Sequence, residues 1–248
     1  MQRLIRAEVQ KLFSTRAFPI TAVTVAILSG VAAISNVFTA GKNGSAKLGT
    51  VDNIHHVLQS GAVTGTTMLA IGIIAMAGEY RHGTIVPSLL AGPDRRKLVI
   101  AKMLTLGAVG ALFGAICFGI GLVAAVPVFA SKGVHHLSGD IPQLFVGAVI
   151  VSAVYAMLGV ALGALTRSTV AAVVGALVWV QLVEVLILQS VAPGVAKWLP
   201  TGAATSITRA ASATSHALAP WPATALLIGY AVAIAAVAGT FVVRRDVA

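Results

Sequence analysis

Charged residues are scarce in this chain of 248 residues. Lys, Arg, Asp and Glu together account for 10 % of it, whereas a typical soluble domain carries about 25 %. Hydrophobic residues make up 58 %, and the mean hydropathy is +0.95. A water-soluble chain of this size cannot bury so much apolar surface. The composition therefore excludes an ordinary cytosolic enzyme, a disordered protein and, in spite of the net charge of +10, a nucleic-acid-binding domain. It predicts an integral membrane protein.

The sequence also lacks the usual motifs of catalytic and metal sites. Its single cysteine, Cys117, lies in an apolar run, which excludes an intramolecular disulfide and a cysteine-only metal site. The Gly41-Lys42 dipeptide is followed by Asn43 instead of the Ser or Thr of an ATP-binding loop. A zinc-binding HExxH pair, a dinucleotide fingerprint and a Ser/His/Asp set are missing as well. We therefore expect no catalytic residue, no metal and no cofactor in this chain.

Long apolar runs are the main feature of the sequence. A helix needs about 20 apolar residues to cross the hydrocarbon core, and a chain in lipid must satisfy its backbone hydrogen bonds internally. Six runs are close to or above this length, at residues 17–38, 61–78, 103–130, 144–165, 170–191 and 223–243. The predicted fold is an all-α polytopic membrane protein, a single transmembrane domain over residues 1–248 with six transmembrane helices.

The basic residues indicate the topology of these spans. Residues 1–16, 79–102 and 166–169 and the tail after residue 243 carry 4, 5, 1 and 2 Lys or Arg residues, which is 12 of the 17 in the chain. The connections on the other side share the remaining 5. Because cytoplasmic connections are enriched in Lys and Arg, both termini are predicted to lie in the cytoplasm.

The first 16 residues have a helical pattern. Ile5, Val9, Leu12 and Phe13 fall on one face of a helix, and the basic residues lie largely away from that face. Such an amphipathic helix fits the membrane surface, with its apolar side towards the acyl chains and its basic side among the headgroups. Packing of this helix against the protein's own cytoplasmic loops is an alternative that the pattern leaves open.

Turn residues divide the cytoplasmic stretch 79–97. Gly83 can end the second span, and Thr84 can cap a short helix that follows. Pro93 ends that helix, after which Asp94 can cap the helix leading into the third span. The pattern favours a short helix between two turns, suited to receiving force from a partner protein. A solvated connector is the plain alternative.

Residues 192–222, on the predicted outer side, contain six Pro or Gly residues that interrupt the stretch (Pro193, Gly194, Pro200, Gly202, Pro220 and Pro222). The stretch is too polar to span the membrane and too apolar for a free loop. Trp198 and Trp221 suit the headgroup level. We therefore expect an extracellular re-entrant segment made of one or two short helices, shielded from lipid by protein or wetted by water.

Glu184 is an acidic residue inside the fifth span. A charge there costs about 2.5–3.5 kcal/mol on insertion scales, and intramembrane ionisable groups usually face a polar interior. Gln181 lies three residues earlier, on the same face of an α-helix, where it can hydrogen-bond Glu184. Either the carboxyl lines a substrate cavity, or it is a paired group that holds two helices together.

Small and hydroxylated residues are frequent in the other spans. Thr64, Thr66 and Thr67 in the second span either line the same cavity or bond back to their own helix. Three GxxxG pairs permit close helix contact, either within the chain or at a dimer face. They are Gly61/Gly65, Gly110/Gly114 and Gly159/Gly163.

Taken in order along the chain, these features resemble the permease subunit of an ABC-2-type ATP-binding-cassette exporter. The resemblance covers nearly the whole length. It rests on the basic N-terminal helix with Glu8 and Lys11-Leu12, on the six spans, and on the series Glu79, Gly83-Thr84 and Pro93-x-Arg95. The interrupted segment before the last span and the ending Arg244-Arg245-Asp246 complete the resemblance. The absence of a fused ATPase and of a large outer domain makes the chain similar to small bacterial exporters of drugs, antibiotic peptides or lipid-like compounds.

The resemblance implies partners that the residues alone do not show. A second permease copy or homologue completes the membrane core among the lipids of the bacterial inner or plasma membrane. Two separate ABC ATPase subunits bind ATP and Mg below it, so that this chain is not itself an enzyme. The implied ATPase-coupling residues are Glu79, Arg81, Gly83, Thr84, Pro93 and Arg95. The implied substrate path passes Thr64, Thr67, Gln181 and Glu184.

Two other functions fit the same spans. A secondary transporter would use Glu184 as a proton relay, and it would follow a pH gradient without ATP. A non-transporting immunity or sensor subunit would have no ATPase partner.

Overall fold

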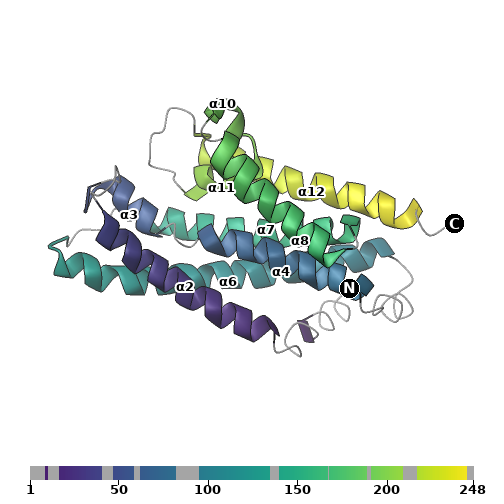
Figure 1. Cartoon of the computed structure of the whole chain (residues 1–248), viewed down its shortest axis with the longest axis horizontal. Helices are drawn as coiled ribbons and strands as arrows, with labels where there is room; N and C mark the ends of the chain where they lie inside the picture. The colour runs from purple at the N-terminus through teal and green to yellow at the C-terminus, as the bar shows by residue number, and fades with distance from the viewer. Residues whose placement is uncertain are drawn as a thin grey trace.

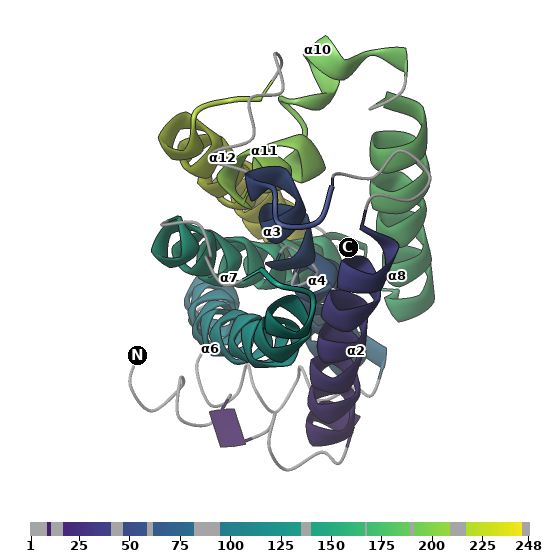
Figure 2. The ribbon, with the colours of Figure 1, turned by 90° about the vertical axis from the view of Figure 1, so that its left-hand side faces the viewer.

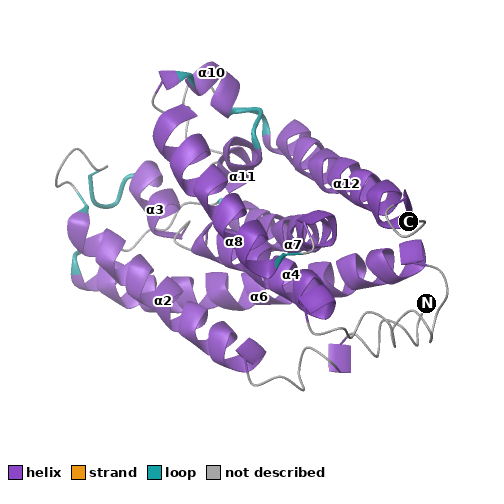
Figure 3. Ribbon diagram, turned by 45° about the vertical axis from the view of Figure 1, so that its right-hand side comes forward, coloured by secondary structure: helices purple, strands orange, loops and turns teal. Residues whose placement is uncertain are grey.

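The computed structural model of the chain describes residues 9–10, 17–40, 47–58, 62–81, 95–134, 140–166, 168–188, 191–208 and 217–244. Over these ranges the chain consists of helices and short turns, without a strand (Figure 3). The helices are α2 (Ala17–Thr39), α3 (Val51–Leu58), α4 (Ala62–Arg81), α6 (Arg95–Ser131), α7 (Ile141–Thr166), α8 (Thr169–Leu177), the π-helix η2 (Val178–Leu188), α10 (Pro193–Ala196), α11 (Pro200–Thr208) and α12 (Pro220–Arg244). The all-α class is confirmed.

Among the residues that the structure describes, five helical segments are long and apolar enough to cross a membrane, namely α2, α6, α7, α8 continued by η2, and α12. Each corresponds to one of the predicted apolar runs. The remaining run, 61–78, forms α4, which lies outside this group of five. Its lower hydropathy comes from the threonines near its start and from Glu79 and Arg81 at its end. The chain is therefore membrane-embedded with five supported spans, and a sixth at α4 stays a prediction.

The helix ends follow local chemistry. α6 is described from Arg95 onwards, and the cap predicted at Asp94 lies outside the described residues. It ends before Gly133, whose φ of 81° is left-handed, while the Val134 N–H donates to the Phe129 carbonyl at 3.0 Å. Such a left-handed glycine commonly closes a helix. α11 and α12 each begin at a proline, a residue suited to the first helical position because its missing N–H would have no partner there.

α7 is the central helix of the bundle and the most buried of the spans. Seen from one end, it lies between α6 on one side and α11 and α12 on the other (Figure 2). α4 crosses it at Gly72 and Gly159, whose Cα atoms are so close to the opposite backbone that a methyl group on either would overlap it. Gly110 and Gly114 of α6 likewise approach the α7 backbone, at the carbonyls of Ser152 and Ala148 respectively. These glycines therefore serve packing within the chain.

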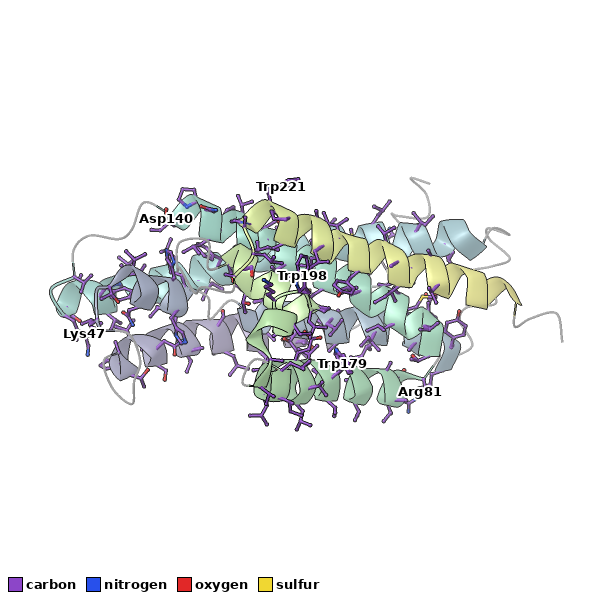
Figure 4. All side chains as sticks on the ribbon, turned by 90° about the horizontal axis from the view of Figure 1, so that it is seen from above. Lys47, Arg81, Asp140, Trp179, Trp198 and Trp221 are labelled. Carbon is purple, nitrogen blue, oxygen red and sulfur yellow. The ribbon has the colours of Figure 1, made fainter. Side chains whose placement is uncertain are left out.

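The two ends of the bundle are distinct. α2 begins and α12 ends at the same end, and the connections from α2 to α3 and from α6 to α7 lie at the other (Figure 1). Arg81 lies at the first end, and Lys47 and Asp140 lie at the second (Figure 4). This alternation agrees with an even number of spans. Cytoplasmic termini stay a prediction.

Two predicted segments fall largely or wholly outside the described residues. Of the N-terminal helix over 1–16, only Val9 and Gln10 are described, and both are helical. The short helix predicted between Gly83 and Pro93 lies outside the description altogether. Of the stretch 79–97 predicted as the connecting loop, residues 79–81 belong to α4 and residues 95–97 to α6, and the rest lies outside the described residues.

Candidate functional site

Two buried polar groups stand out among the apolar contacts. The first, which we call the connector pair, consists of Glu79 and Lys102 and lies where α4 ends and α6 begins. The second, the η2 carboxyl cluster, consists of Glu184, Thr201 and Tyr155 and lies where η2 meets α11 and α7. Buried polar groups need partners, so the contacts of each group indicate its role.

The connector pair is a buried ion pair between two helices. Lys102 Nζ lies 3.0 Å from Glu79 Oε1, and the side chains are 3 % and 9 % exposed. The same ammonium group lies 3.5 Å from the Ala75 carbonyl, one turn earlier in α4. Lys102 therefore contacts α4 at two points, and it does so close to where the chain leaves α4 and enters α6.

The predicted ATPase-coupling residues differ in where they lie relative to this pair. Glu79 lies within the protein against Lys102, whereas Arg81 is exposed in the last turn of α4. Arg95 is the first residue of α6. Gly83, Thr84 and Pro93 lie outside the described residues. The structure thus brings Glu79 and Arg81 to one end of the bundle and adds Lys102, which the sequence analysis did not select.

Glu184 of the η2 carboxyl cluster is 1 % exposed. Its Oε2 accepts a hydrogen bond from the Thr201 N–H at 2.8 Å. Thr201 is the second residue of α11, and the N–H groups at a helix start carry partial positive charge with no partner in their own helix. The carboxyl group thus holds η2 to the start of α11. Within the described residues Oε1 has no hydrogen-bond partner, and Tyr155 of α7 lies near Glu184 and Thr201.

The predicted pairing of Gln181 with Glu184 is wrong. Gln181 is exposed on the outer surface of η2, whereas Glu184 is buried and bonded to Thr201. The reason is that residues 178–188 form a π-helix instead of an α-helix. A π-helix bonds residue i to i+5, so its wider turn spreads residues three apart further around the axis. Of the two alternatives for Glu184, these contacts support a group that joins two helices.

Residues 191–208 fold back onto the bundle, and α8 and α12 converge on them (Figure 1). Most of α11 is buried, against α7 and α12. The Tyr230 hydroxyl donates to the Trp198 carbonyl at 2.9 Å, and the Leu218 N–H donates to Ser206 Oγ at 3.2 Å. Together with Glu184, these bonds attach the outer segment, residues 191–208, to both flanking helices.

Aromatic side chains lie around this outer segment. Trp198 and Trp221 are 53 % and 79 % exposed, and Trp179 of η2 is 50 % exposed. In Figure 4 all three lie between the end marked by Arg81 and the end marked by Lys47 and Asp140. Exposed indole rings suit a membrane interface, and the headgroup level of Trp198 and Trp221 stays a prediction.

The threonines predicted to line a cavity are placed differently from one another. Thr64 is buried, and its hydroxyl lies 3.1 Å from that of Ser152 on α7. Thr67, one turn later, is half-buried. Thr64 therefore joins α4 to α7, which is the packing alternative of the sequence analysis.

Metal ligation finds no support in the described part of the chain, where no group of three His, Cys, Asp or Glu side chains could hold an ion.

The residues that the sequence analysis missed had local signals. Lys102 is the last basic residue before the third apolar run, opposite Glu79 across the connection. Thr201 follows Pro200, a proline suited to starting a helix. Neither signal names a partner, because the contacts join residues 17 and 23 positions apart.

A comparison with protein families identifies a relationship. A family model described as ABC-2 family transporter protein matches residues 4–183. The matched range contains the connector pair, both flanking helices and Gln181, and it ends one residue before Glu184. The outer segment and α12 lie beyond it. The comparison with curated proteins gave no match.

Proposed function

The chain belongs to the ABC-2 transporter family and is the membrane permease of an ABC-type transporter. From this premise we propose that it works as an exporter in the bacterial inner membrane, with both termini in the cytoplasm. A second permease, identical or related, completes the membrane core, and two separate ATPase subunits bind ATP and Mg. The cargo is hydrophobic or amphipathic, a drug, an antibiotic peptide or a lipid-like compound. The family match over residues 4–183 is the observation that carries this proposal.

The ATPase subunits dock at the end of the bundle where α4 ends and α6 begins. Arg81 is exposed there and Arg95 opens α6, which places basic residues on both sides of the connection. We assign Arg81, Gly83, Thr84, Pro93 and Arg95 to this docking segment. ATP binding closes the ATPase pair, the docked segment moves, and the attached helices switch access from one side of the membrane to the other.

The substrate path runs along the surface shared by α4 and α8 with η2. These elements pack against each other in the chain, and Gln181 presents a polar amide on the exposed surface of η2. An amide facing lipid would be unfavourable, which supports a neighbouring permease or a cargo on this side. Thr67 and Gln181 face the path in this proposal, and Thr64 and Glu184 hold the helices behind them.

Reconstitution tests the proposal. The full chain, purified from its own cells in mild detergent, is expected to retain an ATPase subunit, and vesicles containing both are expected to transport amphipathic dyes only with ATP and Mg. Arg95→Glu combined with Thr84→Pro should leave ATP hydrolysis and abolish transport. Lys132→Met, at the opposite end of α6, is the matched control and should transport normally.

The alternatives give different results in the same vesicles. Transport driven by a pH gradient without ATP would replace the proposal with a proton-coupled transporter that uses Glu184. A chain that retains no ATPase and transports nothing would be an immunity or sensor subunit. Unchanged transport in the Arg95→Glu, Thr84→Pro variant would remove the docking role of the connection between α4 and α6.

A further inference from the structure

The connector pair joins two helices that otherwise share little surface. α4 and α6 each pack along α7, and they contact each other much less than they contact α7. Glu79 lies in the last turn of α4 and Lys102 lies in the second turn of α6. The ion pair therefore provides a direct link between α4 and α6 at the end from which the connecting residues 82–94 depart.

We propose that Lys102 is a positioning residue for coupling: through Glu79 it holds the end of α4 to the start of α6, so that both helices move together when the connection is displaced. This inference rests on the proposed function and deepens it, because it assigns a role to a residue outside the docking segment. It also separates Glu79 from the residues that meet the ATPase. Glu79 acts inside the bundle, and Arg81 is left as the exposed member at the end of α4.

Stability alone does not account for the pair. Removing two charges from water has a cost that the attraction between them only partly offsets, and two apolar side chains of similar size are often at least as stable. What the ion pair adds is a directional bond of 3.0 Å between two side chains, with a second contact of the ammonium group to the Ala75 carbonyl. Apolar side chains can slide past each other, and this arrangement cannot.

The decisive variant therefore replaces both residues. Glu79→Met with Lys102→Met removes both charges and leaves no buried charge unpaired, so the fold and the binding of the ATPase subunits should persist. In vesicles with the ATPase subunits we expect ATP hydrolysis to continue while the cargo transported per ATP falls about tenfold, which is within the usual range of coupling between sites. The reversed pair, Glu79→Lys with Lys102→Glu, should restore the ratio to within about threefold of the original chain.

A measurement without ATPase separates this inference from the proposed function. Spin labels at Arg81→Cys and Ile100→Cys, in a Cys117→Ala background, report the distance between the end of α4 and the start of α6 in lipid nanodiscs. Ile100 is 47 % exposed and Arg81 is exposed, so both positions accept a label. We expect a narrow distance distribution in the labelled chain and one about twice as wide after the double Met replacement.

The outcomes of the two measurements separate a failure of this inference from a failure of the proposed function. An unchanged width, or an unchanged amount of cargo per ATP in the double Met variant, would overturn the positioning role of Lys102. A wider distribution supports it, even in a chain that retains no ATPase, and in that case only the proposed function fails. Lys132→Met, which removes a lysine just beyond the far end of α6, should change neither measurement.

Discussion

Glu79 and Glu184 are both buried, and they are held by different kinds of partner. Glu79, near the end of α4, faces the ammonium group of Lys102 at 3.0 Å. Glu184, within η2, accepts a backbone N–H from the start of α11 at 2.8 Å. The first arrangement joins two long helices through a pair of side-chain charges. The second joins a span to a short helix through a single charged side chain.

The difference follows from position in the bundle. Near the end of a helix a lysine can bury its aliphatic part and keep its charged head close to the polar boundary. A fully charged ammonium group can therefore reach the Glu79 carboxylate. Deeper in the bundle a second charged side chain would add its own desolvation cost. The start of a helix offers roughly half a positive charge without that cost. The two glutamates should therefore respond differently when their partners are removed.

The largest effect is expected from Lys102→Met, which leaves the Glu79 carboxylate buried without its cation. Loss of one member of a buried ion pair lowers the free energy of unfolding by about 3–5 kcal/mol. Unfolding in mixed detergent micelles, titrated with a denaturing detergent, measures this loss. The double replacement of Glu79 and Lys102 by Met is the matched control, and its free energy of unfolding should lie within about 1 kcal/mol of that of the original chain. If the Lys102→Met variant were as stable as the double variant, Glu79 would carry no unpaired buried charge, and the ion pair would be contradicted.

A smaller effect is expected when Glu184 is replaced. Glu184→Leu leaves the Thr201 N–H buried without an acceptor and should lower the free energy of unfolding by about 1–3 kcal/mol. Glu184→Gln keeps a carbonyl oxygen that can accept the bond, so its loss should be about 1 kcal/mol or less. Hydrogen exchange at Thr201 locates the change, because the amide should exchange faster in the Leu variant only. Equal exchange in both variants would contradict the role of this hydrogen bond.

The contrast between the two glutamates also shows which features a sequence reveals. The long apolar runs predicted the spans to within a few residues at most ends, because burial in lipid demands runs of about 20 apolar residues. These signals are local. They depend on neighbours in the chain and not on which helices meet.

The partners of the glutamates were not predictable in this way. Placing Gln181 beside Glu184 assumed α-helical spacing, and the composition of residues 178–188 does not distinguish a π-helix from an α-helix. Lys102 contributed to the predicted cytoplasmic charge but had no assigned partner. Whether Thr64 faced a cavity or Ser152 depended on how α4 crosses α7. That crossing is determined by glycines from distant parts of the chain, at Gly72 and Gly159.

Tyr230→Phe tests whether Glu184 alone secures the outer segment. The Tyr230 hydroxyl donates to the Trp198 carbonyl at 2.9 Å from the α12 side. Since its removal deletes one hydrogen bond in a partly exposed setting, we expect a loss of about 0.5–1.5 kcal/mol. Combined with Glu184→Leu, a loss smaller than the sum of the two single losses would show that both bonds hold one cooperative segment, because each single replacement already removes the coupling between them. Strictly additive losses would mean that η2 and α12 hold the segment independently.

The smallest effect on stability is expected from Gln181→Leu, although this residue lies only three positions from Glu184. Its side chain is on the exposed surface of η2, and surface substitutions usually change the free energy of unfolding by no more than about 0.5 kcal/mol. If Gln181 faces the substrate path, transport should nevertheless fall while the fold is retained, in contrast to Glu184→Leu, whose expected effect is a loss of stability. Leu182→Gln, a matched exchange on the neighbouring exposed position, controls for polarity in general. A Gln181→Leu chain that loses more than about 1 kcal/mol would place its amide in an internal contact, and the distinction between the buried and exposed polar residues of η2 would then fail.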